Sequence, residues 1–187
     1  MEIYLLRHTA VATPGLCYGH HDVSLADTFA AEAEAVLARL PAVEPGRVFS
    51  SPATRCRQLA ALLAPGPVLD ERLRELHFGS WENQPWDALP PTELDPWMAD
   101  YVHVAPPGGE TYGQLQARAV AFLEELLATP PPVAPAVVVT HGGVVRALLA
   151  HTLGMPLAHA FRLNIDFGSV TQLRWTAGHW QVKGINR

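Results

Sequence analysis

The sequence predicts an α/β fold, namely a three-layer αβα sandwich with a mostly parallel central sheet and an antiparallel edge. Short apolar strands alternate with helical segments along most of the chain, which is typical of a parallel sheet covered by helices on both faces. At the C-terminus, two strand-like runs at 170–175 and 180–185 flank a turn at Ala177-Gly178 and predict a hairpin, which supplies the antiparallel edge. With 187 residues, 49% of them apolar, the chain is expected to form one domain over 1–187 with a large core.

The first half of the chain predicts two helices between short strands. The strands are expected over 2–6, 47–49 and 68–69. The first helix is expected over 25–40, because its apolar residues recur at helical spacing, with Asp27 as a cap and Pro41 at its end. The second helix is expected over 52–64, since proline is well accepted near the start of a helix.

Residues 74–112 interrupt this alternation. They contain three of the five tryptophans, Trp81, Trp86 and Trp97, with prolines between them. The segment is too long for an ordinary connection, and long insertions in compact domains often serve as lids or binding loops. We therefore expect a lid-like insertion at about 74–112. Its tryptophans either form an aromatic wall for a flat ligand or pack the insertion against the sheet, which is the interpretation that we favour.

The second half of the chain predicts two further helices on either side of a buried strand. A helix is expected over 112–128, with Thr111 as its N-cap. An apolar strand over 136–140 follows, and then a helix over 143–153 that ends at a glycine.

Polar side chains follow three of these strands at the point where each strand ends. They are Arg7-His8-Thr9, the segment from Ser50 to Arg55, and His141-Gly142-Gly143. In open α/β sheets the ligand crevice lies outside the carboxyl ends of the strands, so we expect two arginines and two histidines to converge. Together with the N–H groups of a helix that opens on glycine, they suit a doubly charged phosphoryl group. The glycine pair has an alternative interpretation as a tight turn that needs φ > 0, but that leaves the preceding histidine unexplained.

Composition and charge exclude several classes of partner. The 13 basic and 18 acidic side chains give a net charge of −5, which disfavours general binding to nucleic acid or to anionic membranes. No apolar run approaches the ~18 residues that span a bilayer. Cys17 and Cys56 form no disulfide framework and are expected to be free, as in a reducing compartment. With no targeting segment at the start of the sequence, a soluble cytoplasmic protein is expected.

Neighbouring polar side chains at His20, His21 and Asp22 have the chemistry of metal ligands. Adjacent histidines rarely converge on one ion without further partners at suitable spacing, so no metal site is expected. We prefer the interpretation that His21 and Asp22 line the entrance of the pocket.

Five motifs in a fixed order carry a resemblance that covers nearly the whole chain. They are Leu6-Arg7-His8, Ser51-Pro52-Ala53-Thr54-Arg55-Cys56-Arg57-Gln58, Leu73-Arg74-Glu75-Leu76-His77-Phe78-Gly79-Ser80-Trp81-Glu82, Pro107-Gly108-Gly109-Glu110-Thr111 and Thr140-His141-Gly142-Gly143. In this order they resemble the histidine phosphatase superfamily, which has the phosphoglycerate mutase-like fold. The resemblance implies a phosphoric monoester hydrolase that uses no cofactor and acts on a small phosphorylated molecule.

The resemblance also implies roles for the residues at the strand ends. His8 would attack phosphorus and form a phosphohistidine, which divides the transfer into two steps. Its other ring nitrogen is expected to donate to a backbone carbonyl. Arg7, Arg55 and His141 would neutralise the phosphoryl oxygens, with help from the Gly142 N–H.

Glu75 occupies the position of the general acid in the third motif. It would protonate the leaving alkoxide and then deprotonate the attacking water. Its acid form needs a raised pKa, which an apolar flank of Phe78 and Trp81 would supply. Glu82 is the rival carboxylate, and we expect it to have a structural or rim position.

The segment after the first motif resembles one branch of the superfamily. Thr9 stands where glycine is commonest, and Gly15-x-Cys17-Tyr18-Gly19-x-x-Asp22-Val23-x-Leu25 follows. This segment is similar to the α-ribazole phosphatases, which implies α-ribazole 5′-phosphate, in cobalamin biosynthesis, as the substrate. Thr9, Tyr18 and His21 are the expected additional substrate-binding residues.

Other functions stay open at this point. A broad-specificity small-molecule phosphatase and a phosphoglycerate mutase-like enzyme are the alternatives among enzymes. Against a mutase, the asparagine that often contacts phosphate in the mutase branch is absent between Arg7 and Leu25. A pseudophosphatase that binds a phosphorylated ligand is the non-enzyme alternative, and a monomer or a homodimer is expected in every case.

Overall fold

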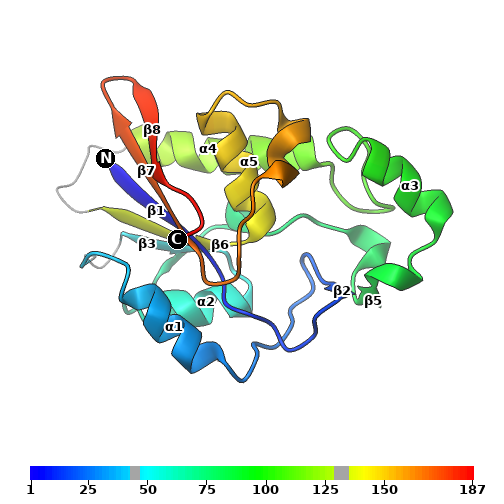
Figure 1. The fold of residues 1–187 in the computed structure, drawn as a ribbon, viewed down its shortest axis with the longest axis horizontal. Coiled ribbons are helices and arrows are strands. Elements are labelled where there is room, and N and C mark those ends of the chain that lie inside the picture. Colours follow the sequence, from blue (N-terminus) through cyan, green and yellow to red (C-terminus); the bar gives the residue numbers. More distant parts are fainter. Residues whose placement is uncertain (43–46, 129–134) are drawn as a thin grey trace.

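A six-stranded sheet forms the centre of the computed structural model, which describes residues 1–42, 47–128 and 135–187 (Figure 1). The strands, in their order across the sheet, are β4 (Val68–Leu69), β3 (Val48–Ser50), β6 (Ala136–Thr140), β1 (Glu2–Arg7), β7 (Val170–Thr176) and β8 (His179–Gly184). The first four are parallel, and β7 and β8 pair antiparallel at one edge. The mostly parallel sheet with an antiparallel C-terminal edge is confirmed.

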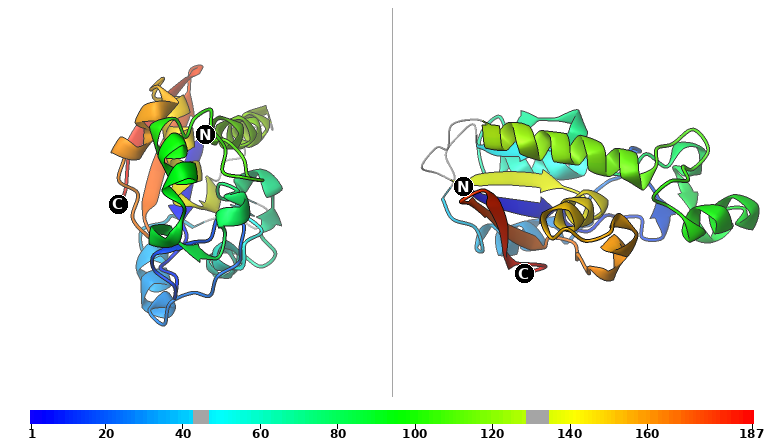
Figure 2. Two further views of the ribbon diagram at one scale, coloured as in Figure 1. Left: turned by 90° about the vertical axis from the view of Figure 1, so that its right-hand side faces the viewer. Right: turned by 90° about the horizontal axis from the view of Figure 1, so that it is seen from above.

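Helices cover both faces of this sheet. They are α1 (Phe29–Leu37), α2 (Thr54–Ala61), α4 (Tyr112–Ala128) and α5 (Gly142–Thr152). Side chains alternate across a strand, so Val138 of β6 packs in the core that contains the buried residues of α4 and α5, whereas Val137 and Val139 pack with those of α1 and α2. Figure 2 shows α4 lying along the sheet. The three-layer arrangement is therefore also confirmed.

The first helix is shorter than the expected 25–40. Its expected first residues are not helical, because Leu25 bridges Val11 and the Ala26 N–H donates to the Ala10 carbonyl. The helix begins at Phe29, and Asp27 is not its cap. The helix expected over 52–64 is also shorter, at Thr54–Ala61, because the residue before Thr54 has an extended backbone.

The expected N-cap of α4 is confirmed. The Thr111 hydroxyl accepts a hydrogen bond from the Gln114 N–H at 3.1 Å, and the Gln114 side chain accepts one from the Thr111 N–H at 2.8 Å. Two orphan N–H donors at the start of the helix are thereby satisfied reciprocally. The C-terminal hairpin turns at Ala177 and Gly178, both with positive φ.

Residues 74–112 run from the catalytic edge of the sheet outward as loops with two short 3₁₀ helices, Gly79–Trp81 and Trp86–Ala88, and the helix α3 (Pro91–Ala99), which lies at the far right of Figure 1. Within it Trp81 and Trp97 are buried, with ring centroids 5.7 Å apart, and the Trp81 indole donates to Glu93. For these two tryptophans, the packing interpretation is confirmed and the ligand wall is wrong. That the insertion acts as a lid stays a prediction.

The insertion also supports the first loop of the chain. Its strand β5 (Gln84–Pro85) pairs with β2 (Leu16–Cys17) of that loop. Gly19 has φ +35°, and a Cβ there would lie 2.4 Å from the Leu76 carbonyl oxygen, so no larger residue fits between the two segments. Among the described residues, no helix is long and apolar enough to cross a bilayer.

Candidate active site

The three polar strand ends meet at one edge of the sheet. β1 and β3 both pair in parallel with β6, and the register places Arg7 opposite Thr140 and Ser50 opposite Val139. The residues that follow are therefore neighbours, and the imidazole rings of His8 and His141 lie 5.2 Å apart. The predicted convergence is confirmed.

His8 is buried, and one of its two ring nitrogens is already bonded. Nδ1 lies 2.8 Å from the Thr9 carbonyl oxygen, which can only accept, so Nδ1 carries the proton. Nε2 is left with its lone pair. Burial, reinforced by Arg55 and then Arg7, lowers the pKa of this imidazole well below its usual value, so the ring is neutral near pH 7.

Arg55 is fully buried and is held by the first loop. Its guanidinium donates to the Gly19 carbonyl at 2.7 Å and to the His21 carbonyl at 3.1 Å, and it lies over the Tyr18 ring at 4.9 Å. Asp22, half exposed, lies 3.6 Å away. The positive charge is thus surrounded mainly by carbonyl oxygens and an aromatic ring.

Arg7 is held by the segment that precedes β7. Its guanidinium donates to the Ile165 carbonyl at 2.6 Å and lies against the Phe167 ring, 3.6 Å from the ring centroid. Burial lowers the pKa of this guanidinium. Phe167 also lies 5.4 Å from the His8 ring, so it forms a wall beside the two residues of the first motif.

Buried polar atoms without partners lie at this site. Within the described part of the chain, Arg7 Nε, Arg55 Nε and Thr9 Oγ1 are buried and have no hydrogen-bond partner. Buried donors are nearly always satisfied in native proteins, so a group of unsatisfied ones points to a missing acceptor. Two guanidinium N–H groups and a hydroxyl suit an oxyanion.

The second histidine, His141, is also fully buried. Its Nε2 lies 2.8 Å from the Ser51 hydroxyl oxygen and 3.5 Å from the Cys56 sulfur. Burial, followed by Arg55 and His8, lowers the pKa of this ring well below its usual value. Burial raises the pKa of the Cys56 thiol to about 12, so this cysteine is not a nucleophile.

The glycine pair after His141 leaves space for neighbouring side chains of the site. Gly142 and Gly143 open α5 with negative φ, so the alternative interpretation as a turn with φ > 0 is wrong. A Cβ at Gly143 would lie 2.2 Å from Glu75 Oε1, and one at Gly142 would lie 3.2 Å from Arg7 Nε. The missing side chains make room for the acid and the arginine.

The two candidate carboxylates have different surroundings. Glu75 Oε2 accepts a hydrogen bond from the Gly143 N–H at 3.1 Å, which brings the carboxylate to the helix that follows His141. Glu82 instead accepts hydrogen bonds from the backbone N–H groups of His20 and Phe78, so it joins the first loop of the chain to the insertion. Phe78, expected to flank Glu75, packs on the tryptophans of the insertion.

The remaining predicted site residues are placed unequally. Thr9 is buried beside His8, and Tyr18 lies 6.3 Å from the His8 ring, so both belong to the site. His21 contributes its carbonyl to Arg55, while its side chain is exposed. In the described part of the chain, no group of three or more His, Cys, Asp or Glu side chains is arranged to hold a metal ion.

Sequence reasoning missed Phe167 and Arg146. Phe167 lies in the loop before β7, where no strand or helix pattern marks it. Arg146 follows Gly142 by one helical turn, and its Nη1 would lie 3.1 Å from a Cβ at that glycine. Because residues four apart lie on the same face of a helix, the expected helix over 143–153 already indicated that Arg146 lies near the site.

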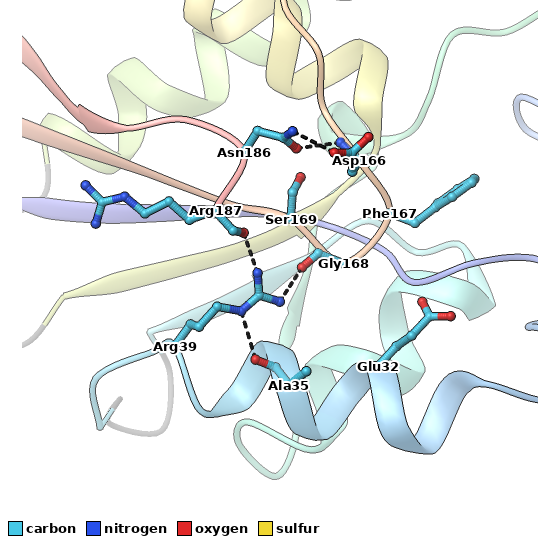
Figure 3. Close-up of a pocket in the computed structure, with 9 residues that line it drawn as sticks. All are labelled: Glu32, Ala35, Arg39, Asp166, Phe167, Gly168, Ser169, Asn186 and Arg187. Carbon is cyan, nitrogen blue, oxygen red and sulfur yellow. Dashed lines mark hydrogen bonds between the residues drawn. The ribbon is translucent and has the colours of Figure 1, made fainter.

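A cavity of about 230 Å³ lies behind the Phe167 loop (Figure 3). Arg39 lines it and donates to the carbonyls of Ala35 in α1, Gly168 and Arg187. The Phe167 ring points away from this cavity. Arg39 therefore anchors the loop to α1 and holds Phe167 toward the catalytic edge.

Comparison with known proteins agrees with this geometry. The model of the histidine phosphatase superfamily (branch 1) matches residues 3–187. A probable phosphoglycerate mutase, GpmB, of Yersinia pestis is 29% identical over 194 residues, which cover 98% of this chain and 89% of that protein. Mycobacterial glucosyl-3-phosphoglycerate phosphatase in complex with VO3 is 30% identical, with a TM-score of 0.82 over 99% of this chain and 98% of that one.

The alpha-ribazole phosphatase of Shigella flexneri has a TM-score of 0.87 over 100% of this chain and 96% of that one, but at 23% identity this likeness shows the fold alone. The family model spans nearly the whole chain, and both phosphatases and mutases are among the similar proteins. The chain is a phosphatase that belongs to the histidine phosphatase superfamily.

Proposed function

We propose that this phosphatase hydrolyses α-ribazole 5′-phosphate through a phosphohistidine at His8. One observation carries the chemistry: a neutral, buried imidazole lies between two arginines that each have a buried N–H without a partner. Phosphoryl transfer requires positioning and charge stabilisation more than any other contribution, and this site offers both.

In the first step, the Nε2 lone pair of His8 attacks phosphorus and the bond from phosphorus to the ester oxygen breaks. The Nδ1 proton stays on its hydrogen bond to Thr9, so the ring is correctly oriented and does not need to lose a proton before it attacks. Arg7 and Arg55 face the phosphoryl oxygens, which carry most of the charge in the transition state. Glu75 protonates the leaving alkoxide, which departs as an alcohol.

In the second step, water attacks the phosphohistidine. Glu75, now a carboxylate, takes a proton from this water, and the bond from nitrogen to phosphorus breaks to release phosphate. His8 and Glu75 return to their starting states, so the cycle is balanced without a cofactor. General acid–base catalysis of this kind contributes about 10²–10⁴-fold to the rate.

The choice of substrate rests on the first loop and on the aromatic side chains at the site. The segment from Thr9 to Leu25 resembles the α-ribazole phosphatases. Phe167 is 40% exposed although it lies beside His8, and the Tyr18 ring is also near His8. An aromatic face beside the nucleophile favours a leaving group that contains a flat ring system. Two of the three tryptophans expected to serve this purpose, Trp81 and Trp97, are buried in the insertion.

Phosphoglycerate chemistry is the second candidate. Two of the similar proteins act on phosphoglycerate or a derivative by name. Arg146 adds a further guanidinium beside Arg7, and a carboxylate on the leaving group would pair with it. Hydrolysis of 3-phosphoglycerate in preference to aromatic esters would favour this candidate, and isomerisation would favour a mutase.

We further propose that the enzyme works in the cytoplasm, as a monomer or a homodimer, on a soluble substrate. Its two cysteines, Cys17 and Cys56, are buried and free, which agrees with a reducing compartment.

The nucleophile is tested by trapping. Wild-type enzyme mixed with a ³²P-labelled monoester and quenched in alkali should retain label on histidine, because phosphohistidine survives base and not acid. His8→Ala should lose the label and the turnover while still binding phosphate. His103→Ala, at an exposed histidine paired with Asp100, is the matched control and should behave as wild type. Labelling of His8→Ala, or near-native turnover, would refute the assignment.

The substrate is tested by comparing kcat/KM for α-ribazole 5′-phosphate, an aryl phosphate and 3-phosphoglycerate. We expect the first to be preferred by at least about tenfold, the difference that 1.4 kcal/mol of transition-state binding produces. Equal values would indicate a broad-specificity phosphatase. Tight phosphate binding with no hydrolysis of any ester would refute the enzymatic proposal.

A further inference from the structure

We propose that the Ser51 hydroxyl fixes the tautomer of His141, with the proton on Nδ1, so that this uncharged ring donates an N–H to the phosphoryl group. Ser51 is thus a positioning residue that acts through His141. The role toward the phosphoryl group rests on the proposed function, whereas the tautomer is a property of the free protein.

The contact joins two adjacent strands. Ser51 follows β3 and His141 follows β6, and both side chains are fully buried. The distance from Ser51 Oγ to His141 Nε2 is 2.8 Å. The backbone N–H of Ser51 donates to Val139 at 2.9 Å, so the serine is itself fixed relative to β6.

The direction of this hydrogen bond follows from the other partners of Ser51. Its oxygen accepts from the Ala53 N–H at 3.4 Å, and its one proton needs an acceptor in this buried place. Two acceptors are near, His141 Nε2 at 2.8 Å and the Cys56 sulfur, and sulfur is the weaker of the two. The Cys56 thiol can in turn donate to the Thr140 carbonyl oxygen, which lies 3.5 Å from the sulfur. Ser51 is therefore assigned as the donor and Nε2 as the acceptor, which leaves the proton of the neutral ring on Nδ1.

An uncharged histidine can assist an oxyanion only through its N–H, because its lone pair repels negative charge. Arg55 and His8 both oppose a positive charge on His141, as does its burial, so the ring does not gain a second proton. The correct tautomer then decides whether His141 helps or hinders. With Nε2 bonded to Ser51, Nδ1 is the nitrogen available to substrate, because its contact with the Cys56 sulfur, at 3.9 Å, is long.

The two histidines of the site are thus set in complementary states. At His8, a carbonyl acceptor holds the proton on Nδ1 and frees the Nε2 lone pair for attack. At His141, a hydroxyl donor occupies the Nε2 lone pair and leaves an N–H for the phosphoryl oxygen. One ring supplies an electron pair and the other supplies a proton donor, although both are uncharged.

The tautomer is measured directly by ¹⁵N NMR of the histidine rings in the unmodified protein near pH 7. Protonated and unprotonated ring nitrogens have well-separated shifts, and the His141 signals are those missing from His141→Gln. We expect a proton on Nδ1 of His141 and none on Nε2. A proton on Nε2 of His141 would overturn the proposal about Ser51, whichever ester the enzyme hydrolyses. If the proton is on Nδ1 but the protein hydrolyses no ester, only the proposed function is refuted.

Variants then test the link to catalysis. Ser51→Ala should mix the two tautomers and lower kcat/KM by about tenfold, as expected for the loss of one buried hydrogen bond. Ser51→Thr keeps the hydroxyl and should restore the native tautomer. Thr171→Ala removes a buried hydroxyl in β7 that accepts from the Asn186 N–H at 3.5 Å, and it should change neither measurement. An unchanged tautomer in Ser51→Ala, or an equal loss in Thr171→Ala, would overturn the proposal.

Discussion

Replacement of Gly143 by alanine tests how the site positions its general acid. A Cβ at this residue would lie 2.2 Å from Glu75 Oε1 and 3.1 Å from the Glu75 carboxyl carbon. Real carbon–oxygen contacts do not reach such distances, so the carboxylate must move by about 1 Å and lose its hydrogen bond from the Gly143 N–H. A displacement of this size at a reacting group typically costs about 10²-fold in rate.

The expected loss for Gly143→Ala on an alkyl phosphate is therefore about 10²–10⁴ in kcat, the full range for a general acid. An aryl phosphate with a good leaving group needs no protonation, so its first-turnover burst should persist while later turnovers slow. Alanine is also the better helix former by about 1 kcal/mol, so a general loss of the helix is not expected. The melting temperature, measured alongside, checks that the fold is intact.

A double-mutant cycle provides the control. If Gly143→Ala acts only through Glu75, the double variant Gly143→Ala/Glu75→Gln should be no slower than Glu75→Gln alone. Additive losses would show that the alanine damages the site by another route. Retention of alkyl phosphate turnover within about threefold of wild type would refute the placement of the acid altogether.

Three further predictions follow from the same site. Phe167→Ala should lower the ratio of kcat/KM for an aryl phosphate to that for an alkyl phosphate by about three- to tenfold, which is the value of one aromatic contact. The control Phe161→Ala removes another exposed ring and should leave this ratio unchanged. Equal losses for both esters in Phe167→Ala would mean that Phe167 only supports Arg7. Burial lowers the pKa of both His8 and His141, so the unfolded chain binds more protons than the folded one near pH 6.5. The melting temperature should therefore fall as the pH decreases from about 7.5 to about 5.5. The double variant His8→Gln/His141→Gln should show a weaker dependence of the melting temperature on pH. Turnover should be unchanged after dialysis against EDTA, and a chelator-sensitive rate that zinc restores would contradict the proposed metal-free mechanism.

The strand ends could be predicted from local pattern because each carries its own signal. β6 is buried at every position and is followed at once by a histidine and two glycines, so its end was visible without any knowledge of its neighbours. The convergence of Arg7, Arg55 and His141 then followed from the rule that parallel strands end at one edge. The start of the first helix could not be predicted in this way, because Leu25, its expected first residue, pairs with Val11 in an isolated bridge instead.

Contacts between segments far apart in the chain were beyond such reasoning. Glycine at 143 leaves the space that the carboxylate of Glu75, 68 residues away, occupies. Phe167 lies beside His8, whereas two of the tryptophans that composition suggested for that purpose, Trp81 and Trp97, are buried in the insertion.

The periodicity of apolar residues, the ends of the strands and the order of the motifs are properties of the sequence alone. They were sufficient to predict the α/β class, the catalytic edge of the sheet and the resemblance to a phosphatase. The proton positions on His8 and His141, and the space left for the acid, exist only once the layers have packed. Their physical origin is that a hydrogen bond or an excluded volume depends on differences of tenths of an ångström between groups that the chain itself keeps far apart.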